Sequence, residues 1–216
     1  MAGLLDEMDR FYLREAVVSH WTGEEYDAAS GNEALARSIH PRLLPAWSIL
    51  PDDGFLEALA NRRPSVVRIN PAPARHNFSL ARWQAGRMCE YLEQSQVVTL
   101  LSRSDIEWRE LNELLENFPR LPLVLLDVGY RSDSYLIPLL KIFPSLHFDS
   151  AGYLAHRQLE TFVERHGPER LLFGSRLPLF TPAAALGVLA SARIHETDRL
   201  AVAGGNLRRL LNSVRK

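Results

Sequence analysis

The sequence predicts an α/β fold, a single parallel (βα) barrel over residues 1–216. Two observations predict it. Seven short apolar runs recur about every 25–30 residues, close to the spacing in a barrel of eight βα units, and the segments between them have helical period. Most of the runs are apolar throughout, which is typical of parallel strands covered on both faces. The runs are 16–20, 44–50, 65–70, 97–101, 123–127, 146–150 and 170–174.

The helical segments have recognisable ends. Residues 104–107 (SDIE) fit a capping box and predict a helix that ends near Phe118. Gly167-Pro168 ends another helix, and Asn206 is predicted to cap the last one. A doubly wound open sheet is the rival architecture, but no Gly-rich phosphate turn follows the first run. No linker or change of composition divides the chain, so the sequence predicts one domain.

Composition excludes several classes of protein. The formal net charge is −1, with 25 Lys and Arg against 26 Asp and Glu, so nothing favours binding to nucleic acid. No apolar run approaches the roughly 18–20 residues of a membrane span, and no polybasic patch would bind a membrane surface. The first ten residues are acidic, unlike a signal peptide. We therefore expect a cytoplasmic protein. The single cysteine, Cys89, lies in a helical segment and is expected to be buried and unreactive.

Four segments carry a family resemblance. They are 4–11 with 16–20, 31–32 with 40–43 (HPRL), 169–175 (ERLLFGS) and 205–211 (GNLRRLL). In this order they resemble the amidohydrolase-related family, TIM-barrel metal-dependent hydrolases and decarboxylases that include the aminocarboxymuconate-semialdehyde decarboxylase group. The resemblance covers essentially the whole chain, and its last two segments are the most specific. It implies a TIM-like (βα) barrel of the metallo-dependent hydrolase type with seven visible strands and the first strand missing.

The expected metal ligands of that family are replaced. Its members have an HxH pair on strand one, His at the ends of strands five and six, and Asp at the end of strand eight. In the family's numbering, strand one is missing here, so the run 97–101 is strand five and the run 123–127 is strand six. Strand five is followed by Ser102, strand six ends in Asp127, and Arg176 replaces the Asp of strand eight. At an effective dielectric of about 20, two unit charges about 4 Å apart interact by about 4 kcal/mol, and the energy doubles when one of them is a dication. Because arginine stays protonated, Arg176 would repel a metal ion that an Asp at this position would attract. We expect a degenerate site with no metal and no cofactor.

Candidate site residues gather at the predicted carboxyl ends of the strands. His20, Asn70, Asp127, Asp149 and Ser175 are expected on one rim. Asp127 and Arg176 are the candidate catalytic residues. Strands six to eight are consecutive, so Arg176 is expected to pair with Asp127 or Asp149.

Other residues have two interpretations. Arg68 would bind a substrate carboxylate or form an internal salt bridge. His20 would contact a ligand at the barrel mouth or be a hydrogen-bonded structural histidine. Tyr130 would contact the same ligand or belong to a solvated loop. His147 and Asp149 alternate on one face of a strand, so they would form a His–carboxylate pair or separate parts of a polar layer. Asp149 is also a candidate ligand contact.

Two functions remain open at this point. The first is a binding or partner protein without catalysis, or a metal-independent enzyme, with a small-molecule ligand at the mouth. The second is a hydrolase or decarboxylase of a small carboxylated or cyclic substrate, with Arg68 binding and Asp127 as acid or base.

The missing strand leaves two sheet edges to be satisfied. The chain opens on a helix, from Leu4 to about Arg14, rather than on a strand. We expect, in this order, that the seven strands close on themselves or that a second copy fills the gap in a homo-oligomer. A third alternative is that the natural chain continues upstream of Met1.

Overall fold

The computed structural model describes residues 2–215. Within them, seven strands form one sheet in the order β1-β2-β3-β4-β5-β6-β7, and all neighbouring strands are parallel. The predicted parallel α/β architecture is therefore confirmed. The strands are β1 (Ala16–Val18), β2 (Leu43–Ser48), β3 (Val66–Ile69), β4 (Val98–Ser102), β5 (Leu123–Leu126), β6 (Leu146–Asp149) and β7 (Leu171–Leu172).

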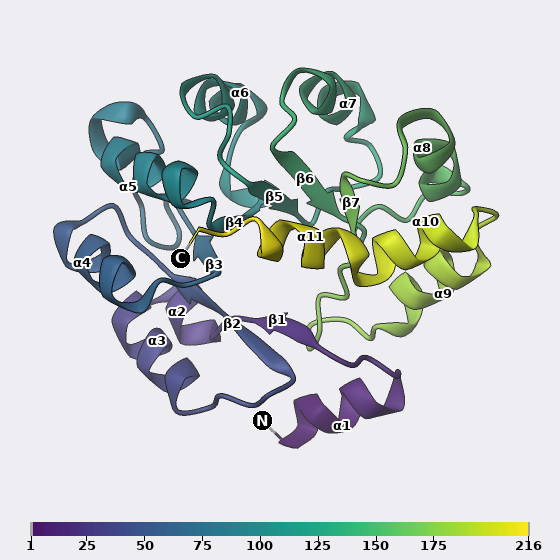
Figure 1. Ribbon diagram of the computed structural model, residues 1–216, viewed down its shortest axis with the longest axis horizontal. Helices are drawn as coiled ribbons and strands as arrows, with labels where there is room; N and C mark the ends of the chain where they lie inside the picture. The colour runs from purple at the N-terminus through teal and green to yellow at the C-terminus, as the bar shows by residue number, and fades with distance from the viewer. Residues whose placement is uncertain (1, 216) are drawn as a thin grey trace.

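Helices connect each strand to the next and cover the outer face of the curled sheet, as Figure 1 shows for α5 to α8. The helices are α1 (Ala2–Arg10), α2 (Trp21–Glu25), α3 (Ala28–Ala36), α4 (Asp53–Arg62), α5 (Arg82–Ser95), α6 (Trp108–Asn117), α7 (Asp133–Ile142), α8 (Gln158–His166), α9 (Ala183–Ser191), α10 (Glu196–Leu200) and α11 (Asn206–Asn212). A 3₁₀ turn η1 (Arg103–Asp105) precedes α6, and a π-helical turn η2 (Ala201–Gly205) joins α10 to α11.

Some helix ends differ from the prediction. The capping box of α6 is formed by Glu107 and Glu110, so the helix begins at Trp108 and Asp105 belongs to η1. The reason is that Ser104 and Asp105 continue the tight turn after β4. The first helix ends at Arg10, not Arg14.

The sheet separates two apolar layers. Successive residues of a strand point to opposite faces, so on β3 Val67 packs outward against the helices and Val66 packs inward. The outer layer is the larger one and includes Cys89, whose burial raises the pKa of its thiol to about 12, as expected of an unreactive cysteine. The inner layer is small: Ala46, Val66, Val98, Leu100, Val124 and Leu172.

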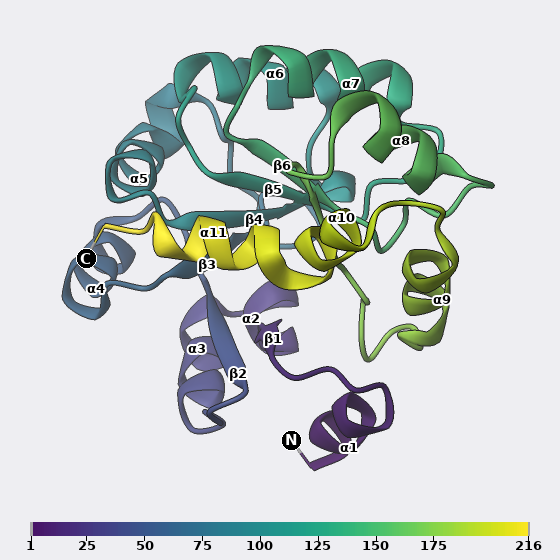
Figure 2. The same ribbon diagram turned by 45° about the vertical axis from the view of Figure 1, so that its right-hand side comes forward.

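Helix α11 fills the inner side of the curled sheet. Its Leu210 belongs to the inner layer, and Leu207 and Leu211 pack against it. Both views show α11 lying across the strands, on the side opposite α6 and α7 (Figure 1, Figure 2). Asn206 is not the cap that we predicted, because it is the first residue of the helix and fully buried. Its Nδ2 donates to the carbonyl oxygens of Pro168 and Leu171 at 2.7 and 2.8 Å, which ties α11 to β7.

The expected closure of the seven strands on themselves is wrong. In the described chain, β1 pairs only with β2, and β7 pairs only with β6. The chain beyond β7 covers part of the β7 edge, since Phe173 N–H donates to the carbonyl oxygen of Val202 in η2 at 2.9 Å. Because η2 and α11 occupy the side toward which β7 would have to bend, the sheet stays an open barrel whose free edge is β1.

Candidate functional site at the barrel mouth

The carboxyl ends of the strands meet at one rim because all seven strands are parallel and in register. The rim therefore carries His20 after β1, Asn70 after β3, Asp127 after β5, Asp149 at the end of β6 and Ser175 after β7. This shared rim was predicted from the sequence and is confirmed.

Asp127 and Arg176 form an ion pair across this rim. Arg176 Nε lies 2.8 Å from Asp127 Oδ1, and the two side chains are 35% and 22% exposed. Both residues have left-handed backbone, with φ of 58° at Asp127 and 52° at Arg176, a conformation that is uncommon outside glycine. The guanidinium also lies over the ring of Phe180, 4.8 Å from its centroid. The predicted pairing of Arg176 is confirmed, and Asp127 is its partner.

Asp149 lies buried next to this pair. Its Oδ1 accepts a hydrogen bond from the backbone N–H of Asp127 at 2.9 Å, and only 6% of the residue is exposed. Burial, followed by the nearby charge of Asp127, raises the pKa of the Asp149 carboxyl to about 7, although Arg176 acts in the opposite direction. A Cβ at Gly174 would overlap Asp149 Oδ2, so the β7 chain approaches the carboxyl this closely only because residue 174 is glycine.

His147 does not pair with Asp149. Its Nδ1 lies 3.0 Å from the carbonyl oxygen of Ser145. Burial lowers the pKa of His147 to about 4, so the ring is neutral at physiological pH. His147 and Asp149 are therefore separate parts of a polar layer and do not form the His–carboxylate pair that the sequence also allowed.

Arg68 forms an internal ion pair. Its Nη2 lies 3.0 Å from Glu24 Oε2 and donates to Ser102 Oγ at 3.1 Å. Glu24 also accepts a hydrogen bond from Ser19 Oγ. This cluster joins the ends of β1, β3 and β4, and its salt bridge is the second of the two roles that the sequence allowed for Arg68.

A second ion cluster lies beside the first one and was missed by the sequence analysis. Arg75 Nη2 lies 2.9 Å from Glu25 Oε1, and Arg75 Nη1 lies 2.8 Å from Asp105 Oδ2. Asn70 is fully buried next to Arg75, and its Nδ2 has no hydrogen-bond partner among the described residues. The adjacent acids Glu24-Glu25, at the end of the short helix α2 that follows β1, were the available sequence signal.

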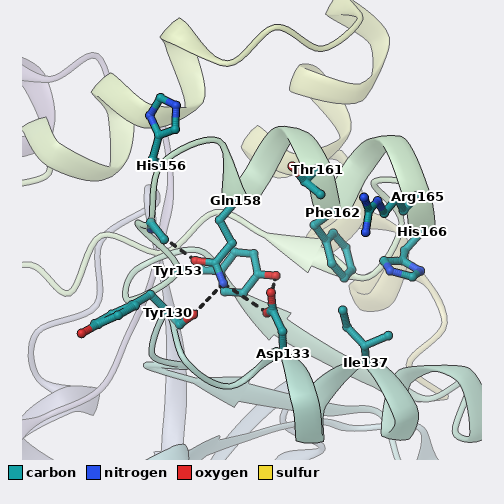
Figure 3. A pocket seen from close by; sticks show the side chains of 11 residues that line it. Tyr130, Asp133, Ile137, Tyr153, His156, Gln158, Thr161, Phe162, Arg165 and His166 are labelled. Atoms are coloured by element: carbon teal, nitrogen blue, oxygen red, sulfur yellow. Dashed lines mark hydrogen bonds between the residues drawn. The ribbon is translucent and has the colours of Figure 1, made fainter.

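The other two candidates have local contacts. His20 is the N-cap of α2, and its Nδ1 accepts the backbone N–H of Thr22 at 3.2 Å. Tyr130 is 54% exposed, and it lines a hollow between α7 and α8 outside the barrel (Figure 3). Among the described residues, neither side chain forms a hydrogen bond or ion pair with Asp127 or Arg176.

The rim residues do not fit a divalent cation. Of the positions that would carry metal ligands, Ser102 is bonded to Arg68, and Asp127 has a guanidinium 2.8 Å away. Among the side chains that the structure describes, no group of three or more His, Cys, Asp or Glu is arranged to hold a metal ion. A cation beside Asp127 would face the positive charge of Arg176 at close range.

The sequence model of one family, described as Amidohydrolase, matches residues 1–212. The chain belongs to the amidohydrolase family. The family resemblance inferred from the sequence motifs is therefore confirmed. A comparison with curated proteins finds no match.

Solved structures of TIM-barrel and amidohydrolase-family proteins have the same fold. A TIM-barrel protein from Bordetella bronchiseptica is similar with a TM-score of 0.79 and 14% identity, covering 99% of this chain and 83% of that one. The 2,6-dihydroxybenzoate decarboxylase from Rhizobium has a TM-score of 0.74 and 15% identity over 97% and 87%. The 5-carboxyvanillate decarboxylase from Sphingomonas paucimobilis has a TM-score of 0.71 and 18% identity, covering 96% of this chain and 82% of that one. Identities this low establish the fold and leave the chemistry to be argued from the site.

No helix of the described chain has the length and apolar character that crossing a membrane requires.

Proposed function

We propose that this chain is a metal-independent binding protein of the amidohydrolase family, which takes a small-molecule ligand at the barrel mouth without catalysing its hydrolysis or decarboxylation. The observation that carries the proposal is the Asp127–Arg176 ion pair at 2.8 Å. It puts a permanent positive charge where the family resemblance places an acidic metal ligand. A guanidinium holds that charge at every physiological pH.

The other charges of the mouth support a binding role. Arg68 is paired with Glu24 at 3.0 Å, and Arg75 is paired with Glu25 and Asp105 at 2.9 and 2.8 Å. Arginines committed to such pairs order the rim, and breaking a buried pair is costly. A ligand would therefore meet a preformed, mutually neutralised polar surface instead of free catalytic groups.

Asp149 favours a second candidate, a metal-independent enzyme. A carboxyl group with a pKa of about 7 can accept or donate a proton at neutral pH, which is the property of a general acid or base. The similar structures that are named decarboxylases share the fold at 15–18% identity. They support a decarboxylase or hydrolase of a carboxylated or cyclic metabolite only as an analogy.

Metal analysis with one substitution tests the proposal. We expect purified wild-type protein to contain no stoichiometric transition metal and to show no Mn²⁺ or Zn²⁺ binding at the rim by calorimetry. Arg176→Asp places a third carboxylate beside Asp127 and Asp149, so this variant should gain a divalent-cation site. Arg176→Asn removes the guanidinium without adding a carboxylate and is the matched control.

Two results would contradict the proposal. One tightly bound metal per wild-type chain, lost on Asp127→Asn, would show that the guanidinium does not exclude a cation. Turnover of a carboxylated substrate by metal-free protein, abolished by Asp149→Asn, would instead establish the second candidate.

A further inference from the structure

A groove separates α7 from α8 on the outside of the barrel. Its larger part has a volume of about 320 Å³ and continues into a smaller hollow of about 140 Å³, with Ile137, Phe162 and His166 lining both. Small-molecule sites begin at about 300 Å³. We call this the α7–α8 groove; Tyr153, Gln158 and Arg165 line its larger part with those three residues (Figure 3).

One wall of the α7–α8 groove is a fixed hydrogen-bond array. Tyr153 Oη donates to Asp133 Oδ1 at 2.6 Å, and Gln158 Nε2 donates to Asp133 Oδ1 at 3.1 Å and to the carbonyl oxygen of Tyr130 at 2.9 Å. Tyr153 and Gln158 are only 1% and 8% exposed. Burial and the neighbouring Asp133 raise the pKa of Tyr153, so the phenol keeps its proton and remains the donor. The wall is therefore rigid and needs no rearrangement to receive a ligand.

The far end of the α7–α8 groove is cationic. Neither Lys141 nor Arg165 has an ion-pair partner among the described residues, and Arg170 donates to the carbonyl oxygens of Phe143 and Leu146 instead of to a carboxylate. The opposing charges at this end are Glu169 and about −0.5 at each of the two helix carboxyl ends. Asp133, the other carboxylate that lines the groove, lies at the amino end of α7. Three positive charges at the carboxyl ends of the helices therefore face about two negative ones, which leaves a local positive excess.

The floor between the two ends is formed by Ile137 and the ring of His166, both half-buried, over the almost fully covered Phe162. The ring of His166 lies 5.3 Å from that of Phe162. A molecule that lay on this floor would remove apolar surface from water while its charged end reached the cations.

We propose that the α7–α8 groove is a binding site for a small organic anion. The apolar body lies on Ile137 and the ring of His166, and the carboxylate or phosphate group contacts Arg165 and Lys141. The site lies outside the barrel, so it does not depend on the function proposed for the mouth.

Binding of hexanoate, its neutral analogue hexanamide and inorganic phosphate, followed by amide NMR, tests the site. We expect hexanoate to bind in the millimolar range, with shifts confined to residues 137–142 and 158–166, and hexanamide to bind about tenfold more weakly. Arg165→Glu with Lys141→Glu should reduce hexanoate affinity by about tenfold or more. Arg14→Glu changes another exposed arginine for which the described residues show no ion pair, and it should leave the hexanoate affinity unchanged.

The phosphate arm distinguishes the two sources of anion. Phosphate that binds more tightly than hexanoate, and loses affinity in the same double variant, identifies phosphate as the group recognised. Equal binding of hexanoate and hexanamide, shifts centred on 127, 149 and 176, or no binding by either anion would each overturn the proposal.

Discussion

Arg176 Nε lies 2.8 Å from Asp127 Oδ1, and both residues have left-handed backbone. The pair joins the ends of β5 and β7 over the buried Asp149 of β6, whose Oδ1 is bonded to the Asp127 N–H. One ion pair thus connects three consecutive strands at the rim. It holds two uncommon backbone conformations, each of which costs free energy that the surrounding contacts offset.

Removing Arg176 should weaken the rim. Because the pair is partly exposed, we expect Arg176→Ala to lower the free energy of unfolding by about 1 kcal/mol. It should also raise the pKa of Asp149 further, since Arg176 is one of the groups that lower it. Urea unfolding and carbon NMR of the carboxyl measure the two effects. Arg109→Ala, at an 87% exposed side chain, is the control and should change stability by less than about 0.5 kcal/mol. If the two variants behave alike, the pair does not organise the rim.

Two buried groups of β6 should give opposite pH dependences of stability. Asp149 has its pKa raised from 3.8 to about 7, so the folded chain keeps a proton that the unfolded chain loses, and stability falls as pH rises through that window. His147 has its pKa lowered from 6.5 to about 4, so the unfolded chain binds the extra proton, and stability rises with pH between those values. Between about pH 4 and 6.5 the two slopes oppose each other.

Single variants should separate the two slopes. Asp149→Asn leaves the His147 term, so the unfolding free energy should rise from pH 4 to 6.5 more steeply than in wild type. His147→Gln leaves the Asp149 term, so stability should fall from pH 4 to 7. Each slope has an upper limit of about 1.4 kcal/mol per pH unit. Urea titrations at several pH values measure them, and identical profiles for both variants would show that neither group is perturbed.

The contact between Gly174 and Asp149 is also testable. A Cβ at Gly174 would overlap Asp149 Oδ2, so Gly174→Ala should cost about 1–3 kcal/mol of unfolding free energy. Gly187→Ala is the matched control, because Gly187 lies in α9 with nothing within 4 Å of an added Cβ, and it should stabilise the chain by up to about 1 kcal/mol. In an Asp149→Ala background the cost at Gly174 should shrink, and an unchanged cost in that double variant would place the strain elsewhere.

The rim pair could be predicted from the sequence because parallel strands bring their carboxyl ends together. Once Asp127 and Arg176 were assigned to the ends of nearby strands, their proximity followed from strand spacing. The Arg75 cluster could not be predicted in this way. Arg75 lies in the loop after β3, and its partners Glu25 and Asp105 follow other strands, so their meeting depends on loop conformations that no periodic pattern encodes.

The path of the last helix was equally hidden. The sequence shows that α11 is amphipathic but not which side of the sheet it covers, and Leu210 would suit an outer or an inner face. Asn206 decides the matter in the structure, since its two bonds to Pro168 and Leu171 fix the start of α11 at β7. A buried asparagine with this role has the same sequence signal as an ordinary helix cap.

The free edge of β1 leads to the last prediction. Ala16 N–H donates to the carbonyl oxygen of Arg42 on the β2 side, and successive N–H groups of a strand point in opposite directions, so the N–H of Val17 points away from β2. The strand has no Pro or Lys to block pairing with another chain, and its three residues are only half-buried. We expect weak self-association through this edge, with a dissociation constant of about 10–100 µM because so short a strand supplies few hydrogen bonds. Sedimentation over a dilution series should show it, and hydrogen exchange at Val17 should slow as protein concentration rises. The amide of Leu101 in the central strand β4 is the control and should be protected at every concentration. Rapid exchange at Val17 at all concentrations, with a monomer throughout, would mean that the open edge remains unpaired in solution.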